Sequence, residues 1–192
     1  MPPKTKITRD MVAQAALDAA RQGGLDAVSA RTVAARLGCS TQPVMYCFRT
    51  IAELKQAVFD LADRFHTAYL LNVSPDRDPL TGIGLNYVRF AVEEPQLFRI
   101  LFQSGLADGR DLPGLLEEES LAPILSAIST EAGTGPDRAR EIFLTLAMFV
   151  HGYASLLANN AMVYDEEQLS VWLERLFAGA VLAAEKQKED TP

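Results

Sequence analysis

The chain is poor in the residues on which many enzymes and metalloproteins depend. Its 192 residues include two cysteines, Cys39 and Cys47, and two histidines, His66 and His151. Two cysteines are too few for a disulfide framework, and no His, Cys or carboxylate spacing is typical of metal ligands. We therefore expect no metal site and no other cofactor, and we interpret both histidines as polar groups of a core or a pocket.

Catalytic and targeting motifs are missing as well. The sequence contains no G-x-G-x-x-G run, no phosphate-binding loop with its lysine and no G-x-S-x-G nucleophile turn. We therefore expect no catalytic residues, and an enzyme is the less favoured class. The N-terminus lacks the apolar run of a signal peptide, and we expect no apolar stretch to reach membrane length. These absences predict a cytoplasmic protein that does not enter a membrane.

Charge is distributed unevenly along the chain. The net charge is -7, but residues 1–50 hold seven Lys or Arg against three Asp or Glu, a balance of +4. Residues 51–192 hold eleven Lys or Arg against 22 Asp or Glu, a balance of -11. Affinity for phosphate depends on local positive charge. The acidic residues 51–192, called the body below, are therefore compatible with a basic N-terminal part that binds nucleic acid.

A short helix that ends at a glycine is predicted after Ser29. The Ser29 hydroxyl can accept hydrogen bonds from the free N–H groups of the following turn, which makes it a good N-cap. Val33, Ala34 and Leu37 recur at helical spacing and form a small buried face. Gly38 follows Leu37 directly, at the place where a left-handed residue usually ends a helix.

A second short helix is predicted only two residues later. Ser40 is its expected N-cap, and Pro43 lies in its first turn, where the missing N–H of proline costs little. Thr50 and Glu53 form a Thr-x-x-Glu capping box that starts a longer helix. Two short helices joined at a glycine have the layout of a helix-turn-helix. That geometry points the start of the second helix at a DNA major groove.

Helical periodicity continues along the rest of the chain, and no alternation indicates a strand. Further helices are predicted at residues 8–22, 50–71, 80–92, 95–102, 115–128, 136–158 and 165–186. The helix at 136–158 is apolar on every side over residues 142–150, so neighbours must cover it. We expect an all-α fold of about nine helices. A three-helix DNA-binding domain spans residues 1–49, and a larger helical domain spans residues 50–192.

This organisation resembles the tetracycline-repressor (TetR) family of transcriptional regulators over about residues 7–61. The most specific part is the run Val33-Ala34-x-x-Leu37-Gly38-Cys39-Ser40, followed by Phe48 and Glu53-Leu54. From about residue 72 onward, the resemblance rests on helix number and order, on the segment 94–99 and on His151-Gly152.

The resemblance implies that the helix after Ser40 is the recognition helix. Its early, outward turns carry Thr41, Gln42, Pro43 and Tyr46. The amide of Gln42 can pair with adenine, and Pro43 offers an apolar edge to a thymine methyl group. Further contacts, mainly to phosphates, are expected from Ser29, Arg31, Ser40, Thr50, Lys4 and Lys6. The hydroxyl residues among these also cap helices when no DNA is present.

The resemblance also implies a homodimer and an effector site. The last two helices of two subunits would form a four-helix bundle. The two DNA-binding domains, residues 1–49 of each subunit and called heads below, would reach successive major grooves about 34–36 Å apart. A small, mostly apolar effector would bind between the helix at 50–71 and the body. Its candidate wall residues are Phe65, Tyr69, Tyr87, Phe90, Phe98, Phe102, Met148, Phe149 and Tyr153. Aromatic residues at such spacing also build ordinary cores, and the apolar run also suits the interior helix of a monomer.

These features predict a ligand-responsive transcriptional regulator. We expect a repressor that binds a palindromic double-stranded operator as a homodimer and is released by its effector. The alternative is a helical interaction or scaffold protein of the same fold that has lost specific DNA binding. Met45, Cys47 and Ile51 favour this alternative, because they stand where the family commonly has Tyr, His and a phosphate-binding Lys.

Overall fold

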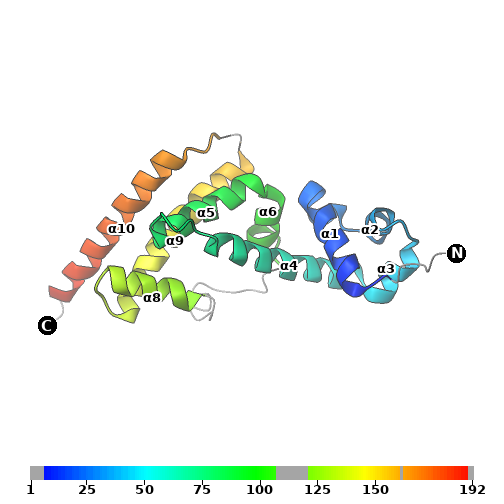
Figure 1. Ribbon diagram of the computed structural model, residues 1–192, viewed down its shortest axis with the longest axis horizontal. Helices are drawn as coiled ribbons and strands as arrows, with labels where there is room; N and C mark the ends of the chain where they lie inside the picture. Colours follow the sequence, from blue (N-terminus) through cyan, green and yellow to red (C-terminus); the bar gives the residue numbers. More distant parts are fainter. Residues whose placement is uncertain (1–6, 107–120, 161, 190–192) are drawn as a thin grey trace. The chain divides into compact units, whose positions relative to one another are not determined.

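The computed structural model describes residues 7–106, 121–160 and 162–189, with side chains as far as Ala184. All regular elements in these ranges are helical, which confirms the predicted all-α fold (Figure 1). The chain divides into two compact units, residues 1–68 with 94–108 and residues 69–93 with 109–192. These units differ from the predicted functional domains, because most of the helix that starts near residue 50 belongs to the first unit.

The first unit is built around a short three-helix core. Its elements are α1 (Arg9–Gly23), the 3-10 helix η1 (Gly24–Ala27), α2 (Ala30–Arg36), α3 (Thr41–Cys47), α4 (Ile51–Leu71) as far as residue 68, and α6 (Pro95–Gln103). Helix α1 packs against α2, α3 and α6, and α2 packs against α3. The fully buried side chains of this core include Val12, Ala16, Val33, Val44, Phe48 and Leu54.

Helix α2 ends in the glycine turn that the sequence predicts. Gly38 has a φ of 62°, in the left-handed region that favours glycine. The amide of Cys39 donates to the carbonyl of Ala34 (3.0 Å), and the amide of Gly38 donates to the carbonyl of Ala35 (3.3 Å). These two bonds satisfy carbonyls that a helix end otherwise leaves without partners. They turn the chain sharply into α3.

Ser40 does not cap α3, so this part of the prediction is wrong. Thr8, Ser29 and Thr50 each accept a hydrogen bond from the amide three residues later, at 3.2, 3.1 and 3.0 Å. Ser40 stands at the same position before α3, but its side chain makes no capping bond. The residue three positions later is Pro43, which has no N–H to donate.

The start of α4 is tied to α1 through Glu53. The predicted capping box forms in part, because the Glu53 amide donates to Thr50 while the Glu53 carboxylate accepts from the amide of Arg49 (2.9 Å). Arg9 Nη2 also donates to Glu53 (2.9 Å), and its guanidinium lies 3.9 Å from the Phe48 ring centroid. The amide of Arg49 and the side chain of Arg9 hold the pKa of the Glu53 carboxyl below its ordinary value.

The second unit is a helical bundle. It contains α5 (Pro79–Glu93), α8 (Ala122–Glu131), α9 (Pro136–Asn159) and α10 (Glu166–Glu189), as well as the last residues of α4. Helix α9 packs against α5, α8 and α10, and α10 packs against α5 (Figure 1). A core cluster at one end comprises Ile124, Ile128, Ala139, Ile142 and Ala184. The predicted helix at 115–128 has its first residues outside the described ranges.

The apolar stretch of helix α9 is longer than we expected. By length and composition it could cross a membrane, contrary to the prediction that no stretch reaches that length. Core helices of folded domains meet the same criterion, and α9 packs against three other helices. These neighbours leave part of it uncovered, since Met148 and Leu156 are each 49% exposed.

Asn86 of α5 holds the end of α4, a role that the sequence did not reveal. Its side chain is buried, and Nδ2 donates to the carbonyls of Tyr69, Leu70 and Asn72 at 3.2 Å each. The last turn of a helix leaves carbonyl groups without intrahelical partners. One buried amide therefore satisfies the end of α4 and joins it to α5.

We expect Gly38→Ala to lower the free energy of unfolding by about 1 kcal/mol, because alanine is strained in the left-handed region. A Cβ at this position would meet nothing within 4 Å, so the loss comes from the backbone and not from a clash. Gly38→Asn is the control and costs less, since asparagine adopts this conformation more readily. Urea unfolding followed by circular dichroism measures both, and an alanine variant no weaker than the asparagine variant contradicts this account.

Candidate functional site

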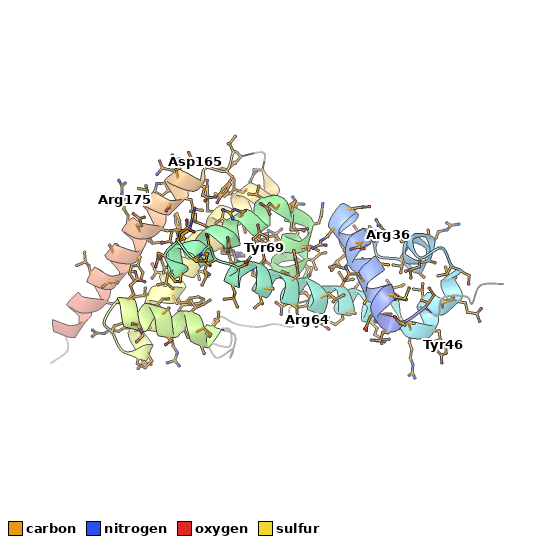
Figure 2. All side chains as sticks on the ribbon, viewed as in Figure 1. Arg36, Tyr46, Arg64, Tyr69, Asp165 and Arg175 are labelled. Atoms are coloured by element: carbon orange, nitrogen blue, oxygen red, sulfur yellow. The ribbon has the colours of Figure 1, made fainter. Side chains whose placement is uncertain are left out.

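One face of α3 is turned to solvent. Thr41, Gln42, Met45 and Tyr46 are all exposed, and the large ring of Tyr46 is 90% exposed. Figure 2 shows Tyr46 extending away from the helix. Val44 points the other way and is completely buried. Burial of an aromatic ring is normally favourable, so an exposed tyrosine beside an exposed amide marks a surface that is available for contact.

The other residues predicted to contact DNA differ in their exposure and hydrogen bonds. Ser29 caps α2, and its hydroxyl also lies 2.8 Å from that of Thr32. Arg31 and Thr50 are exposed, and within the part of the chain that the structure describes Arg31 makes no ion pair. Pro43 is half-buried, so part of its ring remains open to solvent. The remaining candidates, Lys4 and Lys6, lie outside the described residues.

Three of the predicted effector-wall residues lie in the first unit. Phe98 is fully buried, with its ring centroid 4.9 Å from that of Phe102. The buried ring of His66 stands edge-on to Phe102 at 5.3 Å, and burial lowers the pKa of His66 to about 4. Phe65 instead lies under the guanidinium of Arg21, 4.6 Å from its ring centroid. His66 is thus a neutral core group at physiological pH.

Three further wall candidates lie on α4 and α5 in the second unit. Tyr69 stands edge-on to the buried Phe90 at 5.5 Å, and its hydroxyl donates to Glu93 at 2.6 Å. Tyr87 reaches α9, where its hydroxyl lies 2.9 Å from His151 Nδ1. Burial raises the pKa of Tyr87 and lowers that of His151, so both groups are neutral near pH 7. This pair is a polar contact between α5 and α9.

The last wall candidates gather around the single tryptophan. The rings of Phe149 and Tyr153 on α9 stand edge-on to Trp172 of α10, at 6.3 and 5.7 Å. Phe149 and Trp172 line a shallow depression with Arg175 and Leu176. Trp172 lies in the helix predicted at residues 165–186, but the sequence did not identify its aromatic partners. Met148 does not join this cluster of rings and is half exposed.

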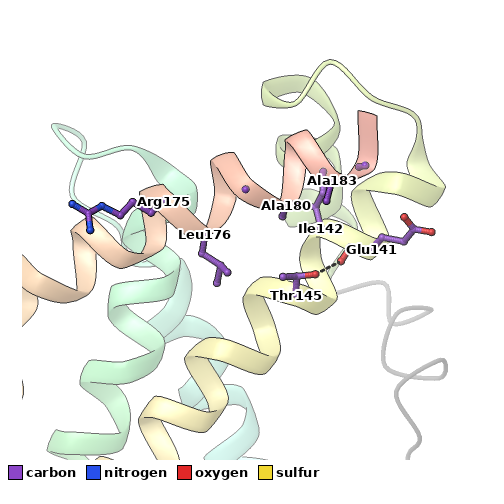
Figure 3. Close-up of a pocket in the computed structure, with 9 residues that line it drawn as sticks. Glu141, Ile142, Thr145, Arg175, Leu176, Ala180 and Ala183 are labelled. Atoms are coloured by element: carbon purple, nitrogen blue, oxygen red, sulfur yellow. Dashed lines mark hydrogen bonds between the residues drawn. The ribbon is translucent and has the colours of Figure 1, made fainter. Parts of the chain in front are cut away.

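A second depression continues along α9 and α10 (Figure 3). Its lining residues are Glu141, Ile142, Thr145, Arg175, Leu176, Gly179, Ala180, Ala183 and Ala184. Many of them are small, and a Cβ at Gly152 or Gly179 would meet nothing within 4 Å. Thr145, Met148, Gly152 and Leu156 are exposed and recur every three or four residues, so they form one stripe along α9. We call this stripe, with Trp172, Gly179 and Leu182 of α10, the open bundle face.

Glu166 at the start of α10 joins distant parts of the second unit. It accepts hydrogen bonds from Arg77 (2.9 Å) and Arg89 (2.5 Å), and the Tyr164 hydroxyl lies 3.4 Å away. The side chain of Arg89 holds the pKa of the Glu166 carboxyl below its ordinary value. No local pattern reveals this network, because its arginines precede Glu166 by 89 and 77 residues. In the described ranges, no cluster of three His, Cys, Asp or Glu could hold a metal ion.

Known proteins have similar sequences and structures. A family model described as "Tetracyclin repressor-like, C-terminal domain" matches residues 80–179. A transcriptional regulator from Rhodococcus sp. Rha1 has a similar structure, with 24% identity, a TM-score of 0.63, and coverage of 92% of this chain and 97% of that one. A comparison with curated proteins finds no match.

Two further solved structures are similar over nearly the full chain. One is a TetR variant from Acinetobacter baumannii AYE in complex with minocycline, with 19% identity, a TM-score of 0.62, and coverage of 93% of this chain and 99% of that one. The other is the multidrug binding protein EbrR complexed with ethidium, with 20% identity, a TM-score of 0.53, and coverage of 92% and 99%. At these identities the likeness shows a shared fold.

Proposed function

The chain belongs to the tetracycline-repressor (TetR) family of transcriptional regulators, and we propose that it is a ligand-responsive repressor. It binds a near-palindromic operator as a homodimer in the cytoplasm and blocks transcription until a small effector releases it. DNA binding is assigned to residues 1–49, and effector binding and dimerisation to residues 50–192. The observation that carries the proposal is the solvent-facing side of α3, with Gln42 and Tyr46 exposed above a buried Val44.

The exposed face of α3 favours DNA binding over the scaffold alternative. Three common phosphate-contact positions are occupied by Met45, Cys47 and Ile51, but Tyr46 provides an exposed hydroxyl next to the first of them. The Ser40 hydroxyl is not used as a cap and can donate to a phosphate. An exposed amide on α3 and a hydroxyl at its start match the base edges and phosphates of DNA. The structure of this head therefore supports a nucleic-acid partner.

The open bundle face supports a homodimer. Met148, Leu156 and Leu182 are large apolar side chains that stand in solvent in the single chain. Gly152 and Gly179 allow another backbone to come close. Burial of apolar surface stabilises an interface by about 25 cal/mol for each Å² removed from water. A twofold arrangement in which α9 and α10 meet the same helices of a second copy covers this face and closes the assembly.

Within residues 50–192, the second unit offers one polar pair that suits an effector. The similar structures from Acinetobacter baumannii and of EbrR hold minocycline and ethidium, which supports a small organic effector here. The contact between Tyr87 and His151 offers a neutral polar anchor among apolar residues of α5 and α9. An effector releases DNA only if it binds the released state more tightly than the DNA-bound state. A hydrogen bond that an effector makes to this pair only in the released state is one source of that difference.

We expect the protein to shift DNA from upstream of its own gene at low salt, with an affinity that falls steeply as salt rises. Gln42→Ala and Arg31→Ala each weaken binding about tenfold, through a lost base contact and a lost charge contact. Arg64→Ala is the matched control, because Arg64 is an exposed arginine on α4, and it leaves affinity unchanged. Fluorescence anisotropy measures all four proteins. If Gln42→Ala and Arg31→Ala both bind DNA as tightly as the wild-type protein, the scaffold alternative is favoured.

Light scattering after gel filtration should give twice the chain mass of 21.0 kDa. Leu156→Glu places a carboxylate in the proposed interface and should give the mass of a single chain, because burying an unpaired charge is costly. Leu71→Glu is the control, since Leu71 is similarly exposed (52%) but lies outside the open bundle face. A dimer that survives Leu156→Glu and dissociates with Leu71→Glu contradicts the assignment.

Tyr87→Phe should change the response to an effector without changing DNA binding in its absence. A panel of small apolar compounds is screened for release of the bound operator, and the active compounds are titrated against the variant. We expect about a tenfold rise in the concentration needed, because the neutral anchor loses its hydrogen bond. Tyr164→Phe, at a half-buried tyrosine outside the predicted wall, should leave the release curve unchanged. Identical curves for wild type and Tyr87→Phe remove this pair from the effector site.

A further inference from the structure

We propose that α3 recognises A·T base pairs, with Gln42 on the edge of adenine and Met45 packed against the methyl group of thymine. The inference rests on the proposed function and adds to it the kind of base pair that each head selects. It also gives a role to Met45, which stood out in the sequence only because the family commonly has a tyrosine at this position. Three features of α3 carry it: the absence of charge, the spacing of the exposed residues and the exposure of Met45.

The first feature is that the recognition helix carries no charge. No Lys, Arg, Asp or Glu occurs between residues 37 and 48. Guanine is most often recognised by Arg or Lys at O6 and N7, and cytosine by a carboxylate that accepts from its amino group. Arg31 belongs to α2, and Arg49 follows the end of α3. The side chains usual for G·C recognition are therefore missing from the helix itself.

The second feature is the order of the exposed groups. Gln42 and Met45 are three residues apart and both exposed, so they are neighbours on the surface of α3. An A·T pair presents N7 and the N6 amino group of adenine beside O4 and the methyl group of thymine. A side-chain amide and an apolar thioether in adjacent positions match this order. The hydroxyl and methyl of the exposed Thr41 are compatible with the same edge.

The third feature is the exposure of Met45 itself. Met45 is 37% exposed, so part of its apolar surface is open to solvent beside the partly exposed Pro43. A methionine adapts its shape to the surface that it meets, and burial of its methyl group and sulfur against a thymine methyl is favourable. Val44 is completely buried, which holds the helix so that Met45 stays outside. Met45 therefore joins Pro43 as a predicted thymine contact.

Selection from a random duplex pool with the full-length protein identifies the preferred half-site. Repeating the selection with Gln42→Ala shows which positions Gln42 recognises, because the base preference at those positions is lost. We expect these positions to be A·T pairs. Replacing a recognised thymine by deoxyuridine removes only the methyl group and should weaken binding about fourfold, the factor that burial of one methyl group supplies.

Protein variants test whether Met45 makes the methyl contact. Met45→Ala should weaken binding to the thymine site about fourfold and bind the deoxyuridine site equally well, since the partner of the methyl group is gone. Met45→Leu should keep the preference for thymine. Met162→Ala is the matched control, because Met162 is a half-exposed methionine outside the first unit, and it should keep both the affinity and the preference.

The outcomes separate this inference from the proposed function. No enriched sequence and no salt-dependent binding would overturn the proposed function itself. An enriched site whose Gln42-dependent positions are G·C pairs overturns the inference alone. The inference is also overturned if deoxyuridine in place of a recognised thymine leaves the affinity unchanged. It is likewise overturned if the Met45→Ala protein still binds the thymine site more tightly than the deoxyuridine site. Preferential binding to double-stranded RNA also counts against it, since uracil carries no methyl group.

Discussion

The head depends on the burial of Val44 and Phe48 beneath α3. Seven residues cannot form a stable helix in water by themselves, so α3 exists because one of its faces is packed. Val44 and Phe48 are four residues apart and both buried, which directs Gln42 and Met45 outward. Arg9 lies over the Phe48 ring and bonds to the carbonyl of Cys47, so α1 holds the end of the same helix. Any function of the exposed face requires these contacts.

Elements set by local chemistry could be predicted from the sequence. Thr8, Ser29 and Thr50 cap helices because each hydroxyl needs only an amide three residues later. Gly38 ends α2 because the left-handed turn needs only the residue itself and its neighbours. The failure at Ser40 is local as well and could have been foreseen, since Pro43 is visible in the sequence. Capping depends on the donor as much as on the acceptor.

Contacts between distant residues could not be predicted in the same way. Asn86 binds carbonyls 14 to 17 residues earlier in the chain, and Glu166 binds arginines 77 and 89 residues earlier. A single sequence carries no periodic signal for such pairs. The aromatic wall candidates show the same limit: spacing placed them on helices, but packing decided that Phe98 is buried and that Phe149 meets Trp172. Residue type and period predict which helices form, and packing determines which side chains meet.

In the proposed repressor, the absence of charged residues from α3 makes dimerisation more important. A good base contact supplies about 1–3 kcal/mol of discrimination, and α3 offers few groups that can make one. A single head would therefore select its site weakly and would rely on phosphate contacts that carry no sequence information. Two heads joined through α9 and α10 double the number of base contacts without a second loss of translational freedom. In the proposed repressor, selective DNA binding thus requires both the polar face of α3 and the apolar face of the bundle.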